Sequence, residues 1–520
     1  MLNGATIVTL RSSRWGDALA LAGGALLVLA FAPFNLWPLA ILLPALLLWL
    51  WQEATPWQAA WRGLLFGLGL FGVGISWTYI SLHSYGSASP PFAALVTLLL
   101  ILLMALYPAV VGWLLARWFP SLGPIHWLLA GPALWALLEW VRSWLFTGFP
   151  WLALGYSQID SPLAGLAPYL GVFGVSWAVF LSAGLLLLAI QGDHRIRLYT
   201  GVLALLLWVG AWGLGRIKWV EPAGEPLRVS LIQGNISQDR KWRPEELEDS
   251  VRVYIRLSVP AMADSDVIIW PEAAIPTFYQ NVEEFAQALQ QDAKDHHVDY
   301  LIGVPWGDSE TGIFHNSVVS LGRTNGFYHK QRLVPFGEYL PLRSLFSFFR
   351  DYVDIPMADF TSGDRAQPLL QAGGHPVGVS ICFEAVFGSE IRNSLPQAQF
   401  LVNVSNDAWF GDSLAPHQHL QIARMRALEA GRYLARATNT GITAIVDDRG
   451  KIIARGTPCQ AEVVKGKVQP LSGATPYVLW GDNAVVLLLV GLLVLALVLS
   501  RKEPVRDGRL SPTIQPGNLQ

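Results

Sequence analysis

The sequence predicts a polytopic α-helical membrane bundle of about eight spans joined to one large α/β domain. Composition gives the first observation, because 52% of the 520 residues are hydrophobic and only 14% are charged, which is too apolar for an ordinary soluble protein. The second observation is a long polar segment in which strand-like and helix-like stretches alternate. The formal net charge of −2 gives no indication of a nucleic-acid partner.

Apolar runs long enough to cross a bilayer, which takes about 20 residues, recur along the chain. Residues 1–216 are therefore expected to form a seven-span bundle, and residues 481–501 an eighth transmembrane helix. Residues 502–520 are polar and are expected to be a disordered cytoplasmic tail. The runs cover residues 16–32, 36–52, 60–81, 92–116, 126–145, 165–190, 198–216 and 483–500.

Basic residues predict the orientation, because Lys and Arg are enriched in cytoplasmic loops. With eight spans, eight basic residues next to the apolar runs fall on the side of the N-terminus. Both termini are therefore expected in the cytoplasm, and residues 217–480 outside it. The basic residues concerned are Arg11, Arg14, Arg62, Arg117, Arg195, Arg197, Arg501 and Lys502.

The segment 217–480 alternates strand-like runs with helical stretches, which predicts an α/β layered domain. Helices are expected at 281–296, where apolar residues recur at spacings of three and four, and at 418–439. The expected strands lie at 227–235, 266–272, 300–306, 316–321, 375–384, 400–409 and 441–448.

Polar residues interrupt the ends of several of these apolar strands. Cys382, in VSICFEAVFG, precedes a change of chain direction, Glu272 ends IIWPE, and Lys330 lies in GFYHKQRLVPFGEYLP. Taken singly, Cys382 could be a small buried hydrophobic residue or a disulfide partner of Cys459. Glu272 could be a helix-capping acid, and Lys330 a solvated lysine. Together they supply a nucleophile, a base that can take the thiol proton, and a cation that can stabilise an oxyanion.

The motifs IIWPE, YHK followed by LVPFGEYLPL, and ICFE, in this order, resemble the Glu-Lys-Cys triad of the nitrilase superfamily. With the apolar runs, the FTGFPWLALGYSQ loop and QGNISQDRKW, the chain resembles the bacterial apolipoprotein N-acyltransferases over nearly its full length. The resemblance implies a nitrilase-like α-β-β-α sandwich in the periplasm, standing on a multi-pass bundle in the bacterial inner membrane. It implies an acyl donor, phosphatidylethanolamine or another phospholipid, a cysteine thioester, and a diacylated apolipoprotein as acceptor.

The same resemblance implies roles for individual residues. Glu272, Lys330 and Cys382 would be catalytic, with the backbone N–H of Phe383 assisting Lys330 in binding the oxyanion. Phe383 and Arg332 stand where the family often carries tyrosine and histidine, which leaves side-chain roles there unsupported. Further supporting or substrate-contacting residues would be Trp242, Asn316, Glu338 and Glu384, whose structural interpretations (a salt bridge, an interfacial indole, a turn asparagine) stay open.

Two further features bear on the membrane. Residues 342–360 place Phe346 and Phe349 at helical spacing, which predicts either a core-facing helix or an interfacial lid that admits acyl chains. Glu139 and Arg142 lie one helical turn apart near the end of a span, and a structural pair that orders the following loop is favoured over headgroup binding.

Three other functions remain as alternatives. A membrane-tethered nitrilase-type amidase would use the same residues but transfer the acyl group to water. A lipid-binding or lipoprotein-binding protein with a relic domain would not need all three reactive residues, and a transporter would need more ionisable residues in its spans. The sequence contains no metal-ligand motif or nucleotide-binding glycine loop, and no cofactor or metal is expected.

Overall fold

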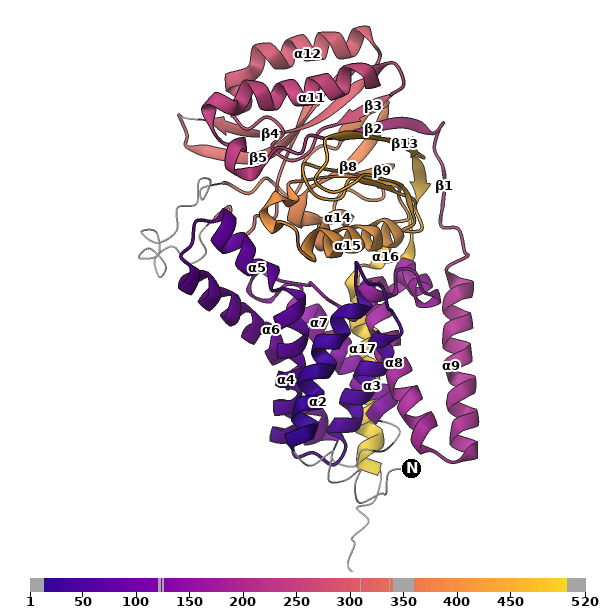
Figure 1. The fold of residues 1–520 in the computed structure, drawn as a ribbon. Helices are drawn as coiled ribbons and strands as arrows, with labels where there is room; N and C mark the ends of the chain where they lie inside the picture. Colours follow the sequence, from indigo (N-terminus) through magenta and orange to yellow (C-terminus); the bar gives the residue numbers. More distant parts are fainter. Residues whose placement is uncertain are drawn as a thin grey trace, which may run out of the picture.

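The computed structural model describes residues 14–119, 123, 126–308, 310–335, 337–339 and 360–502. Figure 1 shows a helical bundle below and a layered α/β domain standing on one end of it. The predicted lid residues Phe346 and Phe349 lie outside the described residues, as does the predicted tail beyond Lys502.

The bundle contains four helical segments that are long and apolar enough to cross a membrane, among the described residues. They are Pro90–Trp118, Pro162–Gln191, His194–Leu214 and Asp482–Ser500, and Pro56–Gly74 with Trp77–Tyr85, bent by 48°, would make a fifth. The predicted count of about eight is therefore not confirmed. The bundle helices are α2 (Arg14–Leu27), α3 (Leu39–Trp51), α4 (Pro56–Gly74), α5 (Trp77–Ile80), α6 (Pro90–Trp118), α7 (Gly131–Arg142), α8 (Ala167–Gln191), α9 (His194–Leu214) and α17 (Asp482–Lys502).

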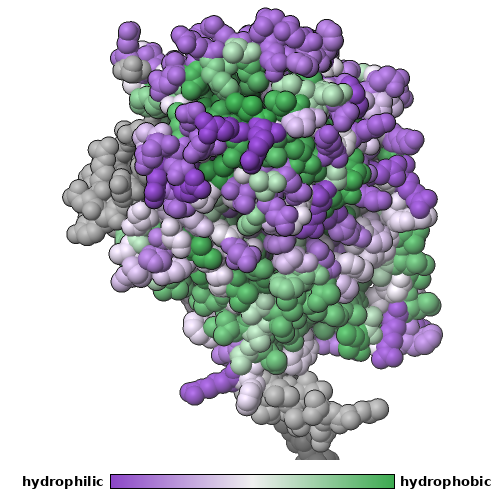
Figure 2. Space-filling view, turned by 45° about the horizontal axis from the view of Figure 1, so that its top comes forward, coloured by the Kyte–Doolittle hydropathy of each residue, from purple (hydrophilic) through white to green (hydrophobic). Residues whose placement is uncertain are grey.

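Small residues allow the bundle helices to approach closely. A Cβ atom at Gly63 of α4 would lie only 2.3 Å from the carbonyl oxygen of Pro108 in α6, so this contact requires glycine. On the face shown in Figure 2, hydrophobic residues form a broad zone over the bundle, whereas hydrophilic residues predominate over the α/β domain. This distribution is typical of a membrane protein with one water-exposed domain.

Glu139 and Arg142 organise the loop that follows α7. Arg142 Nη1 donates to the carbonyl oxygens of Phe149 and Trp151 at 2.9 and 2.5 Å. Glu139 Oε1 accepts from the backbone N–H of Leu154 at 2.9 Å. Both charged side chains are buried, and their bonds fix the loop backbone, which favours the structural role over headgroup binding.

This loop also joins the bundle to the α/β domain. Gln418 Oε1 accepts hydrogen bonds from the indole N–H groups of Trp151 and Trp77, at 2.6 and 3.3 Å. The Gln418 amide donates to the Gly74 carbonyl at 3.1 Å. Because all of these groups are buried, the two parts of the chain form a continuous polar junction.

The α/β domain is built on two six-stranded sheets. The first has the order β13-β2-β3-β4-β5-β6 and the second the order β12-β11-β10-β9-β8-β7. The first sheet contains β2 (Leu227–Gln233), β3 (Val267–Ile269), β4 (Asp299–Asp308), β5 (Ile313–Leu321), β6 (Gly326–His329) and β13 (Glu462–Val468). The second contains β7 (Leu370–Ala372), β8 (His375–Ile381), β9 (Phe400–Ser405), β10 (Leu434–Thr438), β11 (Ala444–Val446) and β12 (Ile452–Arg455), and the short β1 (Val220–Pro222) and β14 (Leu471–Gly473) pair beside them.

The two sheets stack face to face with helices on both outer sides (Figure 1). One apolar core contains residues of both sheets, such as Leu231 and Val402, and lies between them. Helices α11 (Leu247–Met262) and α12 (Glu283–Asp295) pack on the first sheet, and α14 (Gly388–Arg392) and α15 (Ala415–Ala430) on the second. This arrangement confirms the predicted four-layer α-β-β-α sandwich.

The helix predicted at 418–439 is wrong in its last part. Helix α15 ends at Ala430, Gly431 takes a left-handed conformation with φ of +60°, and Leu434–Thr438 form strand β10. A left-handed glycine is a common helix terminator. Strand β10 lies inside its sheet and is buried on both faces. Such a strand lacks the alternation of apolar and polar residues that usually marks a strand, so its sequence can be mistaken for a continuation of the helix.

Candidate active site

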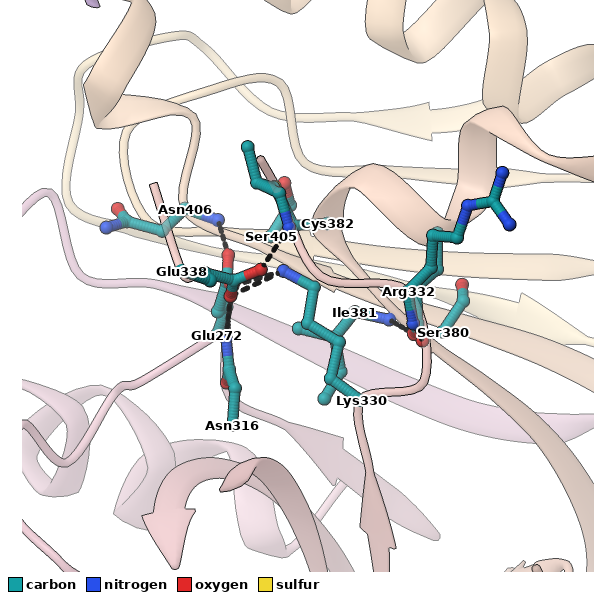
Figure 3. A network of polar contacts seen from close by, with 12 residues as sticks. Glu272, Asn316, Lys330, Arg332, Glu338, Ser380, Ile381, Cys382, Ser405 and Asn406 are labelled. Atoms are coloured by element: carbon teal, nitrogen blue, oxygen red, sulfur yellow. Dashed lines mark hydrogen bonds and ion pairs between the residues drawn. The ribbon is translucent and has the colours of Figure 1, made fainter. Parts of the chain in front are cut away.

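The three predicted reactive residues follow three different strands of the sandwich. Glu272 comes shortly after β3, Lys330 directly after β6, and Cys382 directly after β8 of the other sheet. Figure 3 shows the side chains of Glu272 and Lys330 next to each other, and the Cys382 thiol is close enough to interact electrostatically with both. Cys382 has a φ of +50°, an uncommon conformation for a residue with a side chain, at the sharp turn from β8 into a short 3₁₀ helix, Cys382–Val386.

Glu272 is held by hydrogen bonds to both of its carboxylate oxygens. Oε1 accepts from Asn316 Nδ2 at 2.8 Å and lies 3.5 Å from Lys330 Nζ, while Oε2 accepts from the backbone N–H of Asn406 at 2.8 Å. The side chain is largely buried, so this carboxylate has one fixed orientation (Figure 3).

Lys330 forms its shortest ion pair with the second predicted carboxylate, Glu338. Its Nζ lies 2.8 Å from Glu338 Oε1, which also accepts from Asn316 Nδ2 at 2.9 Å. Burial acts to lower the pKa of Lys330, but the carboxylates of Glu338 and Glu272 outweigh it and raise the pKa above its usual value. Lys330 is therefore a permanent cation in this site, suited to stabilising negative charge.

Cys382 is a free, buried thiol, and Cys459 is free and exposed, so no disulfide joins them. Burial and the nearby Glu272 carboxylate raise the pKa of the Cys382 thiol, and Lys330 counteracts part of this shift. The resting group is therefore the protonated thiol. Reaction at neutral pH requires a base that takes the proton as the sulfur attacks.

Glu384 holds together the two backbone segments that carry Cys382 and Lys330. It is fully buried, and it accepts from the backbone N–H groups of Ile381, Gln331 and Arg332 at 2.6, 2.6 and 3.0 Å. Burial raises its pKa to about 7, against the lowering effect of these hydrogen bonds. Glu384 thus acts on the site by positioning other groups.

Trp242 and Phe383 are chain neighbours of groups in this site, Lys241 and Cys382. Trp242 follows α10 (Gln238–Lys241) and is partly exposed. Phe383 packs against Phe387, with ring centroids 5.0 Å apart, and against the core of the bundle. The turn that carries Cys382 therefore borders the apolar core that the bundle shares with the α/β domain.

The sequence matches two protein-family models, the apolipoprotein N-acyltransferase N-terminal domain over residues 23–185 and carbon-nitrogen hydrolase over residues 228–477. The apolipoprotein N-acyltransferase of Methylococcus capsulatus is 49% identical over 465 residues, which cover 89% of this chain and 92% of that protein. The chain belongs to the apolipoprotein N-acyltransferase family. The family member of Nitrosomonas europaea is 45% identical over 484 residues, covering 92% of this chain and 96% of the relative.

Membership in the apolipoprotein N-acyltransferase family confirms the resemblance inferred from the motifs. The carbon-nitrogen hydrolase match also confirms the nitrilase-like class of the sandwich domain. Among the described residues, no group of three or more His, Cys, Asp and Glu side chains is arranged to hold a metal ion.

A charged cluster next to Cys382 was not predicted. His419 Nε2 lies 3.2 Å from the Cys382 carbonyl oxygen, and His419 Nδ1 lies 3.1 Å from Asp407 Oδ1. Arg436 Nη2 pairs with Asp407 Oδ2 at 2.8 Å, and all three side chains are buried. The available signal was Asp407 itself, a charged residue just after an apolar strand, as Glu272 is.

Lys241 is a second buried lysine that the motifs did not indicate. Its Nζ donates to the backbone carbonyl of Glu272 at 3.0 Å, and the residue is only 1% exposed. Burial lowers its pKa to about 8, although Glu272 and Cys382 act in the opposite direction. Lys241 therefore holds the chain segment that carries Glu272 in place. Its burial as a cation lowers the free energy of unfolding at neutral pH.

We expect Lys241→Met to be at least as stable as the wild type at pH 7 and less active, on the order of tenfold, because Glu272 loses a positioning donor. Since the unfolded chain holds the Lys241 proton up to about pH 10.5, wild-type stability should rise by about 3 kcal/mol between pH 8 and 10.5. The variant should lack this rise. Thermal melts across that pH range test it, with exposed Lys294→Met as control, and a variant less stable than wild type at pH 7 contradicts it.

Proposed function

We propose that this protein is an N-acyltransferase that moves a fatty acyl chain from a phospholipid to the α-amine of the lipidated N-terminal cysteine of diacylated apolipoproteins. Glu272, Lys330 and Cys382 are its catalytic residues, and phosphatidylethanolamine is the expected donor. The observation that carries the proposal is the convergence of a thiol, a carboxylate and a permanent cation, in a chain whose relatives are named apolipoprotein N-acyltransferases.

In the first half-reaction, the Cys382 sulfur attacks the ester carbonyl of the phospholipid while Glu272 takes the thiol proton. Negative charge on the tetrahedral oxygen is stabilised by the Lys330 ammonium and the backbone N–H of Phe383. The C–O ester bond then breaks, and Glu272 returns the proton to the leaving alkoxide, which departs as a lysophospholipid. The raised pKa of the thiol supports this assignment, because it makes a base necessary.

In the second half-reaction, the amine of the apolipoprotein attacks the thioester carbonyl. Glu272 takes a proton from the amine, an amide bond forms, the C–S bond breaks, and the proton restores the Cys382 thiol. Glu338 and Asn316 keep the side chains of Glu272 and Lys330 in position during both steps. Trp242 would contact the substrate. No redox step occurs, so neither half-reaction calls for a cofactor.

The membrane setting belongs to the same proposal. Residues 1–216 and 481–501 would hold the protein in the bacterial inner membrane with both termini in the cytoplasm, and residues 217–480 would form the periplasmic catalytic domain. The packing of Phe383 and Phe387 against the apolar bundle supports a route by which acyl chains reach Cys382 from the bilayer.

The test is the mass of the Cys382 peptide after purified protein is mixed with phosphatidylethanolamine and no acceptor. We expect a hydroxylamine-labile acyl adduct on Cys382, absent in Cys382→Ala and formed about 10²–10⁴-fold more slowly in Glu272→Gln. Melting curves check that both variants remain folded. An unmodified thiol in folded wild type, with no lysophospholipid released, would remove the phospholipid-donor mechanism.

The amidase alternative predicts a different product from the same experiment. If water takes the acyl group, free fatty acid accumulates at the same rate with or without a diacylated peptide. If the acyltransferase proposal is right, adding the peptide converts the adduct into an N-acyl peptide and suppresses free fatty acid.

A further inference from the structure

A cavity remote from the three reactive residues lies where the bundle meets the α/β domain. Its volume is about 350 Å³. It is lined by residues 159–161, the 3₁₀ turn at Pro162–Leu166, the end of α9, helix α15 and the turn between β11 and β12. Nothing in the proposed acyl transfer uses it.

Basic side chains dominate the lining of this cavity. Arg216, Arg424, Arg449 and Lys451 line it, against one acidic residue, Asp160. Arg424 engages both carboxylate oxygens of Asp160, with Nη1 at 3.0 Å from Oδ2. The carboxylate is therefore neutralised within the cavity, and three positive charges remain.

The three remaining cations are available to a ligand. Within the described part of the chain, the side chains of Arg449 and Lys451 form no hydrogen bond or ion pair. Asp447, at the start of their turn, accepts instead from their backbone N–H groups at 3.0 and 2.8 Å. Arg216 lies over the ring of Trp212, 3.7 Å from its centroid. The Asp448 carboxylate offsets part of the charge of its neighbour Arg449, and the remaining positive charge around this open pocket favours an anionic ligand.

The cavity has a rigid floor. A Cβ atom at Gly165 would lie 1.9 Å from the carbonyl oxygen of Ala211, so the Pro162–Leu166 turn is pressed against the end of α9. Arg424 Nε donates to the carbonyl oxygen of Gly450 at 2.7 Å, which ties the Asp447–Lys451 turn to α15. The cations are thus held on elements that are fixed relative to one another.

The surface next to the cavity is suited to acyl chains. Helix α9 stands at the edge of the bundle in Figure 1, and only Thr200 and Ala211 of its residues are buried. Leu205, Leu206 and Val209 are 63%, 64% and 54% exposed one to two turns before Trp212. An exposed tryptophan at the end of such a helix is typical of the membrane–water interface.

We propose that this cavity binds the phosphate-bearing headgroup of an anionic phospholipid whose acyl chains lie along α9. The apolar face of α9 favours a lipid over free phosphate. The site is distinct from that of the acyl donor.

The experiment measures lipid binding to the full-length protein in a neutral detergent by native mass spectrometry. The probes are phosphatidylglycerol, phosphatidylcholine and inorganic phosphate. We expect one phosphatidylglycerol molecule to bind more tightly than phosphatidylcholine, with an affinity that falls as salt is raised. The triple variant Arg216→Gln/Arg449→Gln/Lys451→Gln should bind phosphatidylglycerol on the order of 100-fold more weakly.

The control removes three exposed charges elsewhere, as Arg256→Gln/Lys294→Gln/Lys467→Gln, and should bind as the wild type does. Equal affinity of the cavity variant and this control overturns the proposal, as does equal binding of phosphatidylcholine. If inorganic phosphate displaces phosphatidylglycerol when both are present at the same concentration, the assignment of the site to a lipid is overturned. If the triple variant does not melt cooperatively, Lys451→Gln alone should weaken binding about fivefold. Because the readout is binding, failure of the acyl-transfer proposal would leave this result intact.

Discussion

Replacing Lys330 with methionine should lower the rate of adduct formation on Cys382 by about 10³-fold, because the oxyanion loses its cationic partner. The variant also leaves the buried carboxylates of Glu272 and Glu338 without their shared ammonium. We therefore expect lower thermal stability as well, and a double variant with Glu338→Gln should recover part of the stability but none of the activity.

A second readout separates a chemical role of Lys330 from a structural one. Lys330 lowers the pKa of the Cys382 thiol, so its removal should shift the pH dependence of iodoacetamide alkylation upward. The rate is followed on the Cys382 peptide, because the exposed Cys459 also reacts. Lys294→Met is the control, since it removes an exposed lysine and leaves the groups around Cys382 unchanged. More than a tenth of wild-type activity in folded Lys330→Met would contradict the proposed role.

The residues at strand ends were predictable because local sequence carries the signal. A charged or nucleophilic side chain directly after an apolar strand stands out, as Glu272 and Cys382 do. The alternation of strands and helices predicted an α/β layered domain, the order of the motifs pointed to the family, and the α-β-β-α layer order came from that resemblance. The supporting residues Glu338, Glu384 and Asn316 came from the resemblance alone, since only the folded chain brings their partners together.

The charged cluster next to Cys382 was hidden by a wrong secondary-structure prediction. In a helix running to residue 439, Arg436 would be an ordinary solvated charge. In strand β10 it is fully buried against Asp407. The role of Lys241 was not predicted for a related reason, because its hydrogen-bond partner is the backbone carbonyl of Glu272. Such a bond depends on the distance between chain segments, which residue types do not encode. The number of spans is harder to predict, since α3 is shorter than a helix that crosses a bilayer and the α4–α5 segment is bent by 48°.

The buried cluster gives the largest expected change in stability. Arg436→Met should lower the free energy of unfolding by about 3–5 kcal/mol at pH 7, because it leaves the Asp407 carboxylate buried without its guanidinium. Arg436, the neighbouring His419 and hydrogen bonds hold the pKa of Asp407 well below its usual value, against the effect of burial. This stability is therefore present at neutral pH and lost as the pH falls toward that low pKa. In the variant Asp407 takes up a proton more readily, so its deficit against the wild type should shrink toward pH 4.

Arg432→Met is the matched control, because Arg432 is equally buried but donates only to backbone carbonyls, including Ala398 at 2.8 Å and Gly473 at 2.7 Å. Its stability deficit should not shrink at low pH. Adding Asp407→Asn to Arg436→Met should restore part of the lost stability, since no charge then remains unpaired there. Melting temperatures between pH 4 and 8 measure both effects. A deficit of Arg436→Met that is constant over this range would mean that lost packing, and not the uncompensated Asp407 charge, destabilises the variant.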